Sequence, residues 1–313
     1  MRAVQFSEYG PPGVLEVAEV EAPHAGPGEI RVAVRASGIS AGETSIRAGR
    51  MREAMTGAFP YRMGMEAAGV VDEVGAGVTG VGIGDEVYGL APMAVRGANA
   101  DRAVLAAWAP KPAAWSWTEA GGAAGGVETS TRVLDRLGVG AGHTVLVQGA
   151  AGGVGTIAVQ LAAARGARVV GTASERNHDF LRSLGAEPTV YGNGLVERVR
   201  ALAPGGVDAV FDCAGGALPD LVAIAGDPAR VVTIAPDPAA AAHGVHLSHT
   251  APGEPLGFAA DTMALHGLGA GAELAERGRL RVPVAAAFPL AEAAAAHELS
   301  ETRHARGKIV LLH

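Results

Sequence analysis

The sequence predicts an α/β protein in two parts, a β-rich, barrel-like domain followed by a doubly wound parallel sheet. Three observations predict it. The first hundred or so residues carry short β-type runs punctuated by Gly and Pro, strand and helix patterns alternate from about Ser116 onward, and one apolar run passes directly into a glycine cluster. With 313 residues, the chain is long enough for two domains that each bury a core.

The first domain owes its β-rich character to five runs that contain β-branched residues and end at turn-forming residues. We expect strands at residues 14–20, 30–36, 69–74, 85–88 and 102–106. Short strands at this spacing are typical of a barrel-like domain, because each one is too short to bury an apolar face alone.

The second domain alternates helices with candidate strands at 144–148, 168–172, 208–212, 230–234 and 245–248. Such alternation predicts a parallel sheet. The end of the chain shows a helix pattern and then a strand at 308–312, and we expect this tail to return to the first domain because the parallel sheet already has its strands. The predicted domains are therefore 1–116 with 283–313, and 117–282. The alanine-rich stretch 239–242 is expected to be a helix or a loop.

The stretch TVLVQGAAGGVG, residues 144–155, predicts a dinucleotide site of Rossmann type. Gly149 can make the tight turn after the strand, Gly152 and Gly153 let the backbone approach a pyrophosphate, and Gly155 lets the helix pack closely on the sheet. The N-terminus of the helix then holds the phosphates. The expected contacts are Ala151, Gly152, Gly153, Val154 and Gly155. The alternative is an ordinary strand–turn–helix whose glycines serve packing only.

The next strand suggests which coenzyme is bound. About 20 residues after the first glycine a ribose-recognition residue is expected at a strand tip, and here the chain reads Ser174, Glu175, Arg176, Asn177. An acidic tip would bind the ribose hydroxyl of NAD, whereas a small hydroxyl followed by arginine suits a 2′-phosphate. With Ser174 at the tip, NADPH is favoured and Arg176 and Asn177 join the site. Glu175 is the competing candidate, because a shift of one residue would favour NAD.

Composition excludes several classes of function. The net charge of −7 and the pI near 5.8 argue against nucleic acid or an anionic membrane as a partner, which leaves a small-molecule substrate. Glu8 interrupts any signal-peptide core and no apolar run reaches transmembrane length, so we expect a cytoplasmic protein. The single cysteine, Cys213, excludes an internal disulfide and a multi-cysteine zinc cage. It follows an apolar run, which indicates a small buried residue rather than a reactive thiol.

Several segments together resemble a known family. They are MRAVQFSEYGPPGVLEV (1–17), ASGISAGETSIRAG (36–49), GMEAAGVVDEVGAGVTGVGIGDEVYG (64–89), GAAGGVGTIAVQLA (149–162) and FPLAEAAAAHELSETRHARGKIVL (288–311). They resemble the medium-chain dehydrogenase/reductase superfamily, and within it the zinc-free quinone oxidoreductase branch that includes zeta-crystallin. The resemblance covers nearly the whole chain. It implies a GroES-like catalytic domain, a Rossmann domain, a cleft between them and a homodimer.

The resemblance also shows where this chain departs from zinc-binding relatives. Those relatives carry a cysteine and a histidine as catalytic ligands, and the matching positions here are Ser40 and Met65. A hydroxyl and a thioether do not replace a thiolate and an imidazole on Zn²⁺, so no catalytic metal is expected. Glu66 matches the acidic residue of the same motif. Without a metal it is expected to be a structural carboxylate.

The expected substrate loop is unusual for the quinone oxidoreductase branch, in which an asparagine and a tyrosine face the substrate. This chain has Ser40 and Ser45 there, and Asn99 where an aromatic residue often stands, which implies a wider and more polar pocket. Thr129 keeps a threonine that lies near the nicotinamide in the family. By the same resemblance, Tyr191 and Lys308 are expected to contact the coenzyme together with Thr129.

Glu128 places a carboxylate beside this threonine, and two interpretations stay open. It forms an ion pair with Arg132 one helical turn later, or it donates a proton or anchors the substrate. The histidines His243, His246 and His249 also suggest a metal site, but side chains three apart on a strand do not all converge. We expect them to face solvent or a subunit interface.

Together these observations predict an NADPH-dependent, zinc-free reductase that transfers hydride to a quinone or an α,β-unsaturated carbonyl compound. The candidate residues at the acceptor are Ser40, Ser45, Asn99, Thr129 and Glu128. One alternative is a biosynthetic tailoring reductase or redox-neutral cyclase acting on a polyketide-like intermediate. Another is a coenzyme-binding protein with little turnover.

Overall fold

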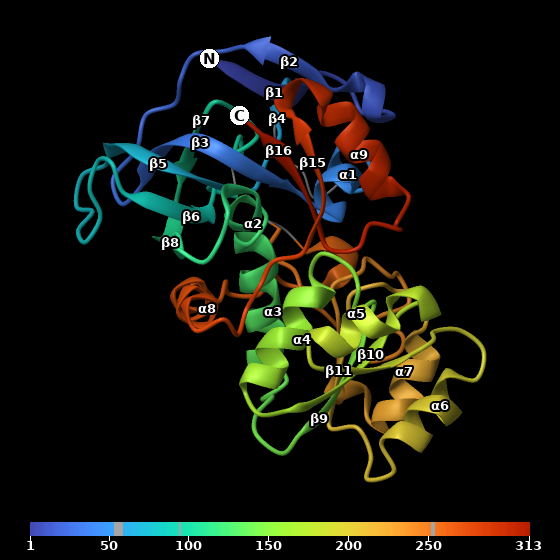
Figure 1. The fold of residues 1–313 in the computed structure, drawn as a ribbon. Helices are drawn as coiled ribbons and strands as arrows, with labels where there is room; N and C mark the ends of the chain where they lie inside the picture. The colour runs from blue at the N-terminus through green and yellow to red at the C-terminus, as the bar shows by residue number, and fades with distance from the viewer. Residues whose placement is uncertain (53–58, 94, 252–253) are drawn as a thin grey trace. The chain divides into compact units, whose positions relative to one another are not determined.

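The computed structural model describes residues 1–52, 59–93, 95–251 and 254–313 (Figure 1). The chain forms two compact units. The first unit consists of Met1–Val127 and Leu265–His313, and the second of Glu128–Ala264. The first is rich in antiparallel sheet and the second contains a parallel sheet with helices, so the predicted fold class is confirmed.

The first unit contains two sheets. The smaller has the strand order β2-β1-β4, and the larger has the order β15-β16-β3-β5-β6-β8, with β7 also paired to β3. The long strand β3 alternates buried and less buried residues, which places Ile30, Val32 and Val34 in the core. The strands are β1 (Arg2–Phe6), β2 (Glu16–Glu19), β3 (Ile30–Ile39), β4 (Tyr61–Arg62), β5 (Glu66–Val74), β6 (Glu86–Leu90), β7 (Arg102–Leu105), β8 (Ala107–Pro110), β15 (Val284–Pro289) and β16 (Lys308–Leu312). The helices are α1 (Ala41–Arg47), α2 (Trp117–Gly121), α8 (His266–Glu276) and α9 (Ala293–Glu301).

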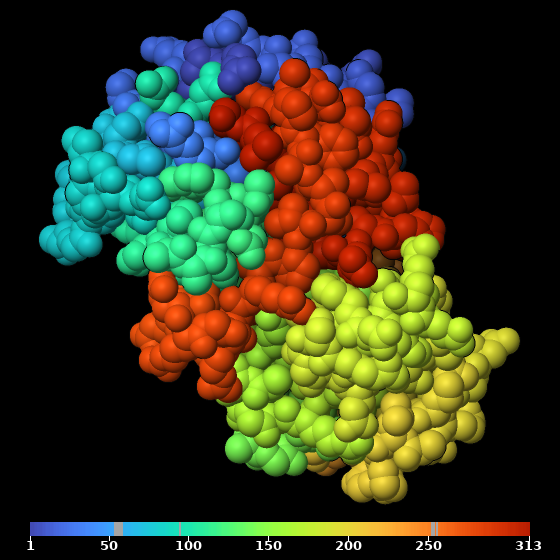
Figure 2. All heavy atoms as spheres, in the orientation of Figure 1, coloured from blue at the N-terminus to red at the C-terminus, as the bar shows by residue number. Residues whose placement is uncertain are grey.

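The C-terminal tail belongs to this first unit. Strand β16 pairs antiparallel with β3, with Ile309 opposite Ile39, and pairs parallel with β15 on its other side. In the space-filling view, C-terminal residues in red lie against N-terminal residues in blue (Figure 2). The prediction that the tail returns to the first domain is confirmed.

The second unit is built on a six-stranded sheet whose paired strands all run parallel, in the order β11-β10-β9-β12-β13-β14. This is the Rossmann order, in which the chain reverses its direction of travel between β9 and β12 and ligands bind at the carboxyl ends of the strands. The strands are β9 (Thr144–Gln148), β10 (Arg168–Thr172), β11 (Ala186–Thr189), β12 (Ala209–Asp212), β13 (Val231–Thr233) and β14 (His246–Leu247). The helices are α4 (Gly155–Ala164), α5 (His178–Ser183), α6 (Leu195–Leu202) and α7 (Leu218–Ala225), together with α3 (Ala124–Arg136) from Glu128 onward. No helix in the described part of the chain is long and apolar enough to span a membrane.

The units divide at positions other than the predicted domain boundaries. Helix α8 joins the β-rich unit because the Tyr88 hydroxyl donates a hydrogen bond to the Leu268 carbonyl (2.6 Å) and the Trp115 indole donates one to the Leu280 carbonyl (3.2 Å). The predicted boundaries after residues 116 and 282 stay a prediction. The stretch 239–242, expected to be helix or loop, forms turns.

Candidate coenzyme and active site

The glycine turn follows β9 as the sequence predicts. Gly149 has a φ of +75°, a conformation that side chains rarely adopt, and a Cβ there would lie 2.9 Å from the Ala214 Cβ. A Cβ on Gly155 would lie 2.3 Å from the Gly149 carbonyl oxygen, so this glycine allows α4 to start close to the strand end. These two glycines are required by the fold itself.

Gly152 differs from them. A Cβ at this position would meet only the Gly149 carbonyl oxygen, at 3.4 Å, which is ordinary contact. Local packing therefore does not require a glycine here, whereas close approach of a phosphate to the backbone would. The neighbouring N-cap residue Val154 makes no side-chain cap, and the first N–H groups of a helix have no partner within the helix. Ala151 to Gly155 thus form a backbone cradle that fits a pyrophosphate.

The tip after β10 gathers three of the expected coenzyme contacts into one short turn. Ser174 is extended and precedes the 3₁₀ helix Glu175–Asn177, and the Asn177 amide donates a hydrogen bond to the Ser174 hydroxyl (3.3 Å). Arg176 and Glu175 are both exposed, and within the described part of the chain the Arg176 guanidinium has no hydrogen-bond or ionic partner. Tyr191 lies in the loop after β11 with 58% of its surface exposed. An unpaired guanidinium beside a hydroxyl that still has its proton to donate fits a phosphate monoester.

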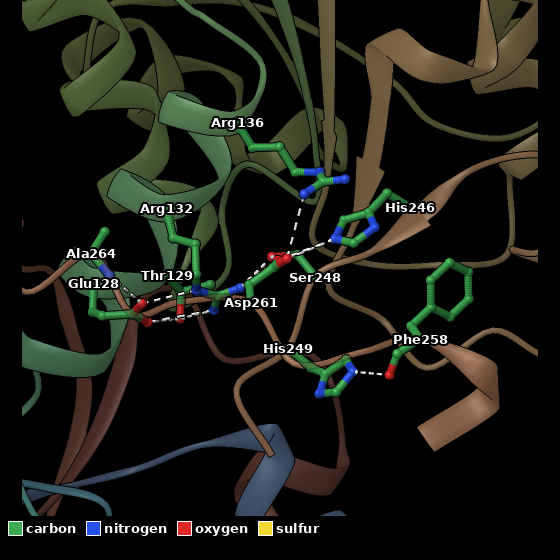
Figure 3. Close-up of polar contacts among 10 residues, drawn as sticks. All are labelled: Glu128, Thr129, Arg132, Arg136, His246, Ser248, His249, Phe258, Asp261 and Ala264. Atoms are coloured by element: carbon green, nitrogen blue, oxygen red, sulfur yellow. Dashed lines mark hydrogen bonds and ion pairs between the residues drawn. The ribbon is translucent and has the colours of Figure 1, made fainter. Parts of the chain in front are cut away.

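Helix α3 carries Glu128 and Thr129. The Glu128 carboxylate is buried, accepts a hydrogen bond from Arg132 Nε (2.8 Å) and another from the Ala264 backbone N–H (3.1 Å), and also accepts one from the Thr129 hydroxyl (3.3 Å) (Figure 3). The local ion pair that the sequence suggested is therefore present. A role of Glu128 in catalysis stays a prediction.

Arg132 extends this network to the end of β14. Its guanidinium bonds to Ser248 and lies 3.5 Å from Asp261, whose carboxylate also accepts from the Ser248 hydroxyl (2.5 Å) and contacts His246 Nε2 (3.0 Å) (Figure 3). Burial alone would raise the pKa of Asp261, but the hydrogen bonds from Ser248 and His246 and the nearby charges outweigh it, so this pKa lies below its ordinary value. The network holds Ser248, Asp261 and Ala264 against α3.

The three histidines of this region have separate surroundings. His246 contacts Asp261, His249 bonds through Nε2 to the Phe258 carbonyl (2.8 Å), and His243 is exposed. Among the described residues, no group of three or more His, Cys, Asp or Glu side chains is placed to hold a metal ion.

In the first unit, Ser40 and Glu43 form a capping box at the start of α1. The Ser40 hydroxyl accepts from the Glu43 N–H (3.2 Å), and the Glu43 carboxylate accepts from the Ser40 N–H (2.8 Å). Because the Ser40 oxygen acts as acceptor here, its hydroxyl proton is free to be donated elsewhere. Ser45 lies one turn later, with the Arg50 guanidinium 3.5 Å from its hydroxyl.

Four buried charged side chains of the first unit, Glu43, Glu66, Arg96 and Lys308, interact electrostatically, and Asn99 is buried in the same unit; we refer to these five residues as the buried polar cluster. The Lys308 ammonium donates to Glu66 Oε1 (2.6 Å), and Glu66 Oε2 accepts from the Gly125 N–H (2.7 Å). Glu66 is thus a structural carboxylate, as the sequence suggested. Lys308 is only 4% exposed and committed to this pair, so its expected contact with the coenzyme stays a prediction.

The other members of the cluster are not fully satisfied. Burial raises the pKa of Glu43 to about 7, and the charge of Glu66 adds to the rise while Lys308 and Arg96 oppose it. Glu43 Oε1, Arg96 Nε and both polar atoms of the Asn99 amide are buried with no hydrogen-bond partner among the described residues. Ser40 and Asn99, both expected at the acceptor, therefore lie in or beside a region whose polar groups are incompletely paired.

The residues that sequence reasoning missed stand at the carboxyl ends of the parallel strands. Five strands of this sheet end in a buried polar residue, namely Gln148, Thr172, Thr189, Asp212 and Thr233. The sequence contains a signal for these residues, because each apolar strand run ends in one polar residue.

Cys213 directly follows Asp212, and burial, with the Asp212 charge adding to it, raises the pKa of its thiol well above the usual value. This agrees with an unreactive strand-end residue.

Comparison with known proteins now assigns the family. Residues 26–137 match the alcohol dehydrogenase GroES-like domain, and residues 184–311 match the zinc-binding dehydrogenase family. A quinone oxidoreductase of Pseudomonas aeruginosa is 31% identical, with 99% of each chain covered. The quinone oxidoreductase of Escherichia coli, solved as a complex with NADPH, superimposes with a TM-score of 0.79 at 26% identity, with 100% of each chain covered.

A second kind of relative is a biosynthetic enzyme system. The spectinabilin polyketide synthase system protein NorB of Streptomyces orinoci is 38% identical over 210 residues, which cover 64% of this chain but 9% of NorB. The chain spans a similarly small part, 3–5%, of three further polyketide synthase proteins that it matches. With the full-length match above, these similarities show that the chain belongs to the medium-chain dehydrogenase/reductase superfamily of oxidoreductases and is related to the quinone oxidoreductases within it.

Proposed function

We propose that this protein is an NADPH-dependent oxidoreductase that acts without zinc and reduces a quinone or an α,β-unsaturated carbonyl compound. The observation that carries the proposal is the glycine turn, in which Gly152 is not required by packing and leaves the backbone open to a pyrophosphate. A homodimer and a cytoplasmic location stay predictions.

Different residues of this chain would hold different parts of the coenzyme. The cradle from Ala151 to Gly155, with the N-terminus of α4, would hold the pyrophosphate, and Ser174, Arg176 and Asn177 would hold the 2′-phosphate. When bound, NADPH supplies the hydride from its nicotinamide ring. The E. coli relative solved with NADPH supports this choice of coenzyme.

At the acceptor, this chain offers neutral donors. The Ser40 oxygen accepts from the Glu43 N–H, which leaves its proton to donate, and Ser45 and Asn99 supply a further hydroxyl and an amide group. The Thr129 hydroxyl donates to Glu128 and would join these donors by exchanging that bond for one to the acceptor. Such donors stabilise a developing oxyanion. Glu128 already accepts from Arg132 and Ala264, so we favour water as the final source of the proton.

Zinc independence rests on the donor set. Ser40 is engaged in the helix cap and Met65 offers only a thioether, a combination that does not fit Zn²⁺. We expect purified protein to contain no stoichiometric zinc by elemental analysis and to keep its turnover in the presence of a chelator. Turnover that is lost on chelation and restored by zinc would contradict this.

The decisive test of the function is Gly152→Ala, with Gly205→Ala as a matched control. Gly205 lies in the same unit, and a Cβ there would meet nothing within 4 Å. We expect Gly152→Ala to weaken NADPH binding by about tenfold or more, because the methyl group occupies the approach of the pyrophosphate, while both variants keep the wild-type melting temperature. Equal affinity for NADPH in wild type and Gly152→Ala would overturn the proposal.

The coenzyme choice has its own test in Arg176→Ala. A charge-assisted contact with the 2′-phosphate contributes about 1.5–3 kcal/mol, so the variant should lose about 10- to 100-fold in affinity for NADPH and almost none for NADH. Dissociation constants from fluorescence titration measure both. If the variant weakens both coenzymes alike, Arg176 does not bind the 2′-phosphate.

A second candidate acceptor is favoured by the 38% identity to NorB over 210 residues. In this alternative, the substrate is a polyketide-like intermediate, reduced or cyclised, and the small side chains Ser40 and Ser45 make room for it. Coenzyme oxidation measured against matched panels of quinones, simple enones and thioester-linked enoyl chains separates the candidates. Tight NADPH binding without turnover on any panel would instead indicate a coenzyme-binding protein.

A further inference from the structure

The strand ends beneath the glycine turn are joined by a buried hydrogen-bond chain. Thr172, the last residue of β10, is fully buried, and Gln148, the last residue of β9, is 5% exposed. The Thr172 hydroxyl accepts from the Gly149 backbone N–H (3.0 Å) and lies 2.6 Å from Gln148 Oε1. Because a hydroxyl has one proton, the first contact fixes the oxygen as acceptor and the second uses the proton.

Thr172 also acts through its backbone. Its carbonyl oxygen accepts from the Ala150 N–H (3.0 Å), so one residue holds two consecutive N–H groups of the glycine turn. On the other side, the Gln148 carbonyl accepts from the Cys213 N–H (3.0 Å), which ties the turn to the end of β12. The turn that would carry the pyrophosphate is therefore anchored on the two strands that flank β9.

We propose that Thr172 is a positioning residue for the coenzyme: its hydroxyl, oriented by Gln148, fixes Gly149 in its left-handed conformation and presents the following N–H groups to the pyrophosphate. The inference rests on the proposed function. It adds a side chain that does not touch the coenzyme and yet sets its affinity.

The physical reason is preorganisation. Without the hydroxyl, the Gly149 N–H loses its partner inside the protein and the turn can rearrange to reach water. Only the fraction of molecules that keeps the original turn binds coenzyme, so the apparent Kd rises by the inverse of that fraction. Because the pyrophosphate is common to both coenzymes, NADPH and NADH should weaken by the same factor. This distinguishes Thr172 from Arg176.

The experiment compares Thr172→Val, which keeps the shape and loses the hydroxyl, with Thr172→Ser, which keeps the hydroxyl and loses a methyl group. Thr233→Val is the matched control, since Thr233 is also a fully buried strand end whose hydroxyl donates to a neighbouring strand end, Asp212 Oδ2 (2.8 Å). The measurements are the Kd values for NADPH and NADH by calorimetry, and hydrogen exchange of the Gly149 amide in the free protein.

We expect Thr172→Val to weaken both coenzymes about tenfold and to speed exchange at Gly149, whereas Thr172→Ser and Thr233→Val stay close to wild type. If Thr172→Val binds as wild type does, or if Thr233→Val loses as much, the inference is overturned while the proposed function stands. If wild-type protein binds neither coenzyme, the proposed function and this inference fail together.

Discussion

Two buried polar regions of this molecule are built on opposite principles. At the carboxyl edge of the parallel sheet, Asp212 accepts from the Ala214 N–H (3.0 Å), the Gly215 N–H (2.9 Å) and the Thr233 hydroxyl, and Thr172 uses both the oxygen and the proton of its hydroxyl. In the buried polar cluster of the β-rich unit, by contrast, Glu43 and Asn99 keep polar atoms without a partner. Both regions are buried, so solvent does not explain the difference.

This difference in hydrogen bonding indicates what each region does. A satisfied network is rigid and holds neighbouring backbone in place, which suits a turn that must fit a coenzyme of fixed shape. Unpaired buried groups cost stability, and proteins keep them mainly at functional sites. The cluster adjoins Ser40, one of the residues we assign to the acceptor. Five substitutions, in three experiments, test whether the two regions differ in this way.

The largest effect is expected from Lys308→Met. Among the described residues, Lys308 is the cation bonded to Glu66, so the substitution leaves a buried carboxylate uncompensated, which costs about 3–5 kcal/mol in free energy of unfolding. Urea unfolding measures it. The double variant Lys308→Met with Glu66→Leu should recover most of that loss, because no charge is left unpaired. A single variant that unfolds like wild type would mean that Glu66 is not a buried charge.

Glu43→Gln should show an effect of similar origin but opposite sign. The pKa of Glu43 is raised from 4.5 to about 7, so the folded state binds more protons than the unfolded state between these values. Wild-type stability therefore falls as pH rises from 4.5 through 7, by about 3 kcal/mol when the penalty is complete. Glutamine never ionises and still caps Ser40. We expect the variant to be the more stable protein near pH 8 and to lose this advantage near pH 4; a constant difference would contradict the buried, neutral Glu43.

The smallest effect, and the most direct comparison, comes from Thr233→Val and Asn99→Leu. Both replace a fully buried polar side chain with an apolar one of similar size. Thr233 gives up a hydrogen bond to Asp212, at a cost of about 1–2 kcal/mol, whereas Asn99 has none to lose and should be neutral or slightly stabilising. Thermal unfolding compares them. Equal losses would show that the two regions do not differ in hydrogen bonding.

Much of the fold could be predicted from local pattern. Strands β9, β10 and β16 begin and end where the sequence places them, because each is an apolar run with clear ends. Strand β11, Ala186–Thr189, was missed because it contains a proline and a glutamate, and β15, Val284–Pro289, because alanine has little strand preference. The strands β1, β4 and β8 were missed as well. Strand β1 is the central strand of the smaller sheet, but β4, β8, β11 and β15 are edge strands, which are fixed by their partners and not by their own composition.

In the candidate site, local features could also be predicted from the sequence, whereas long-range contacts could not. The glycine turn could be predicted because a tight turn with a positive φ favours glycine. The Glu128–Arg132 pair could be predicted because its members are one helical turn apart. The contact between Arg132 and Asp261 could not, since 129 positions separate them and no local rule pairs them. Likewise, nothing in the sequence around Glu43 shows that Lys308 bonds to Glu66, or that Glu43 Oε1 has no hydrogen-bond partner among the described residues. Long-range partner choice is what the tertiary structure adds.

The position of β16 has a consequence for how the protein is made. This strand lies between β15 and β3, in the interior of the larger sheet, although it is synthesised after strands β1 to β15. During translation, β3 cannot pair with β16 until the parallel-sheet unit has been synthesised. All six strands of that unit therefore exist before β16 does. The two units therefore obtain their last strands in the opposite order to that in which their synthesis begins. The parallel-sheet unit has all its strands first, and the β-rich unit is complete only when β16 has been synthesised.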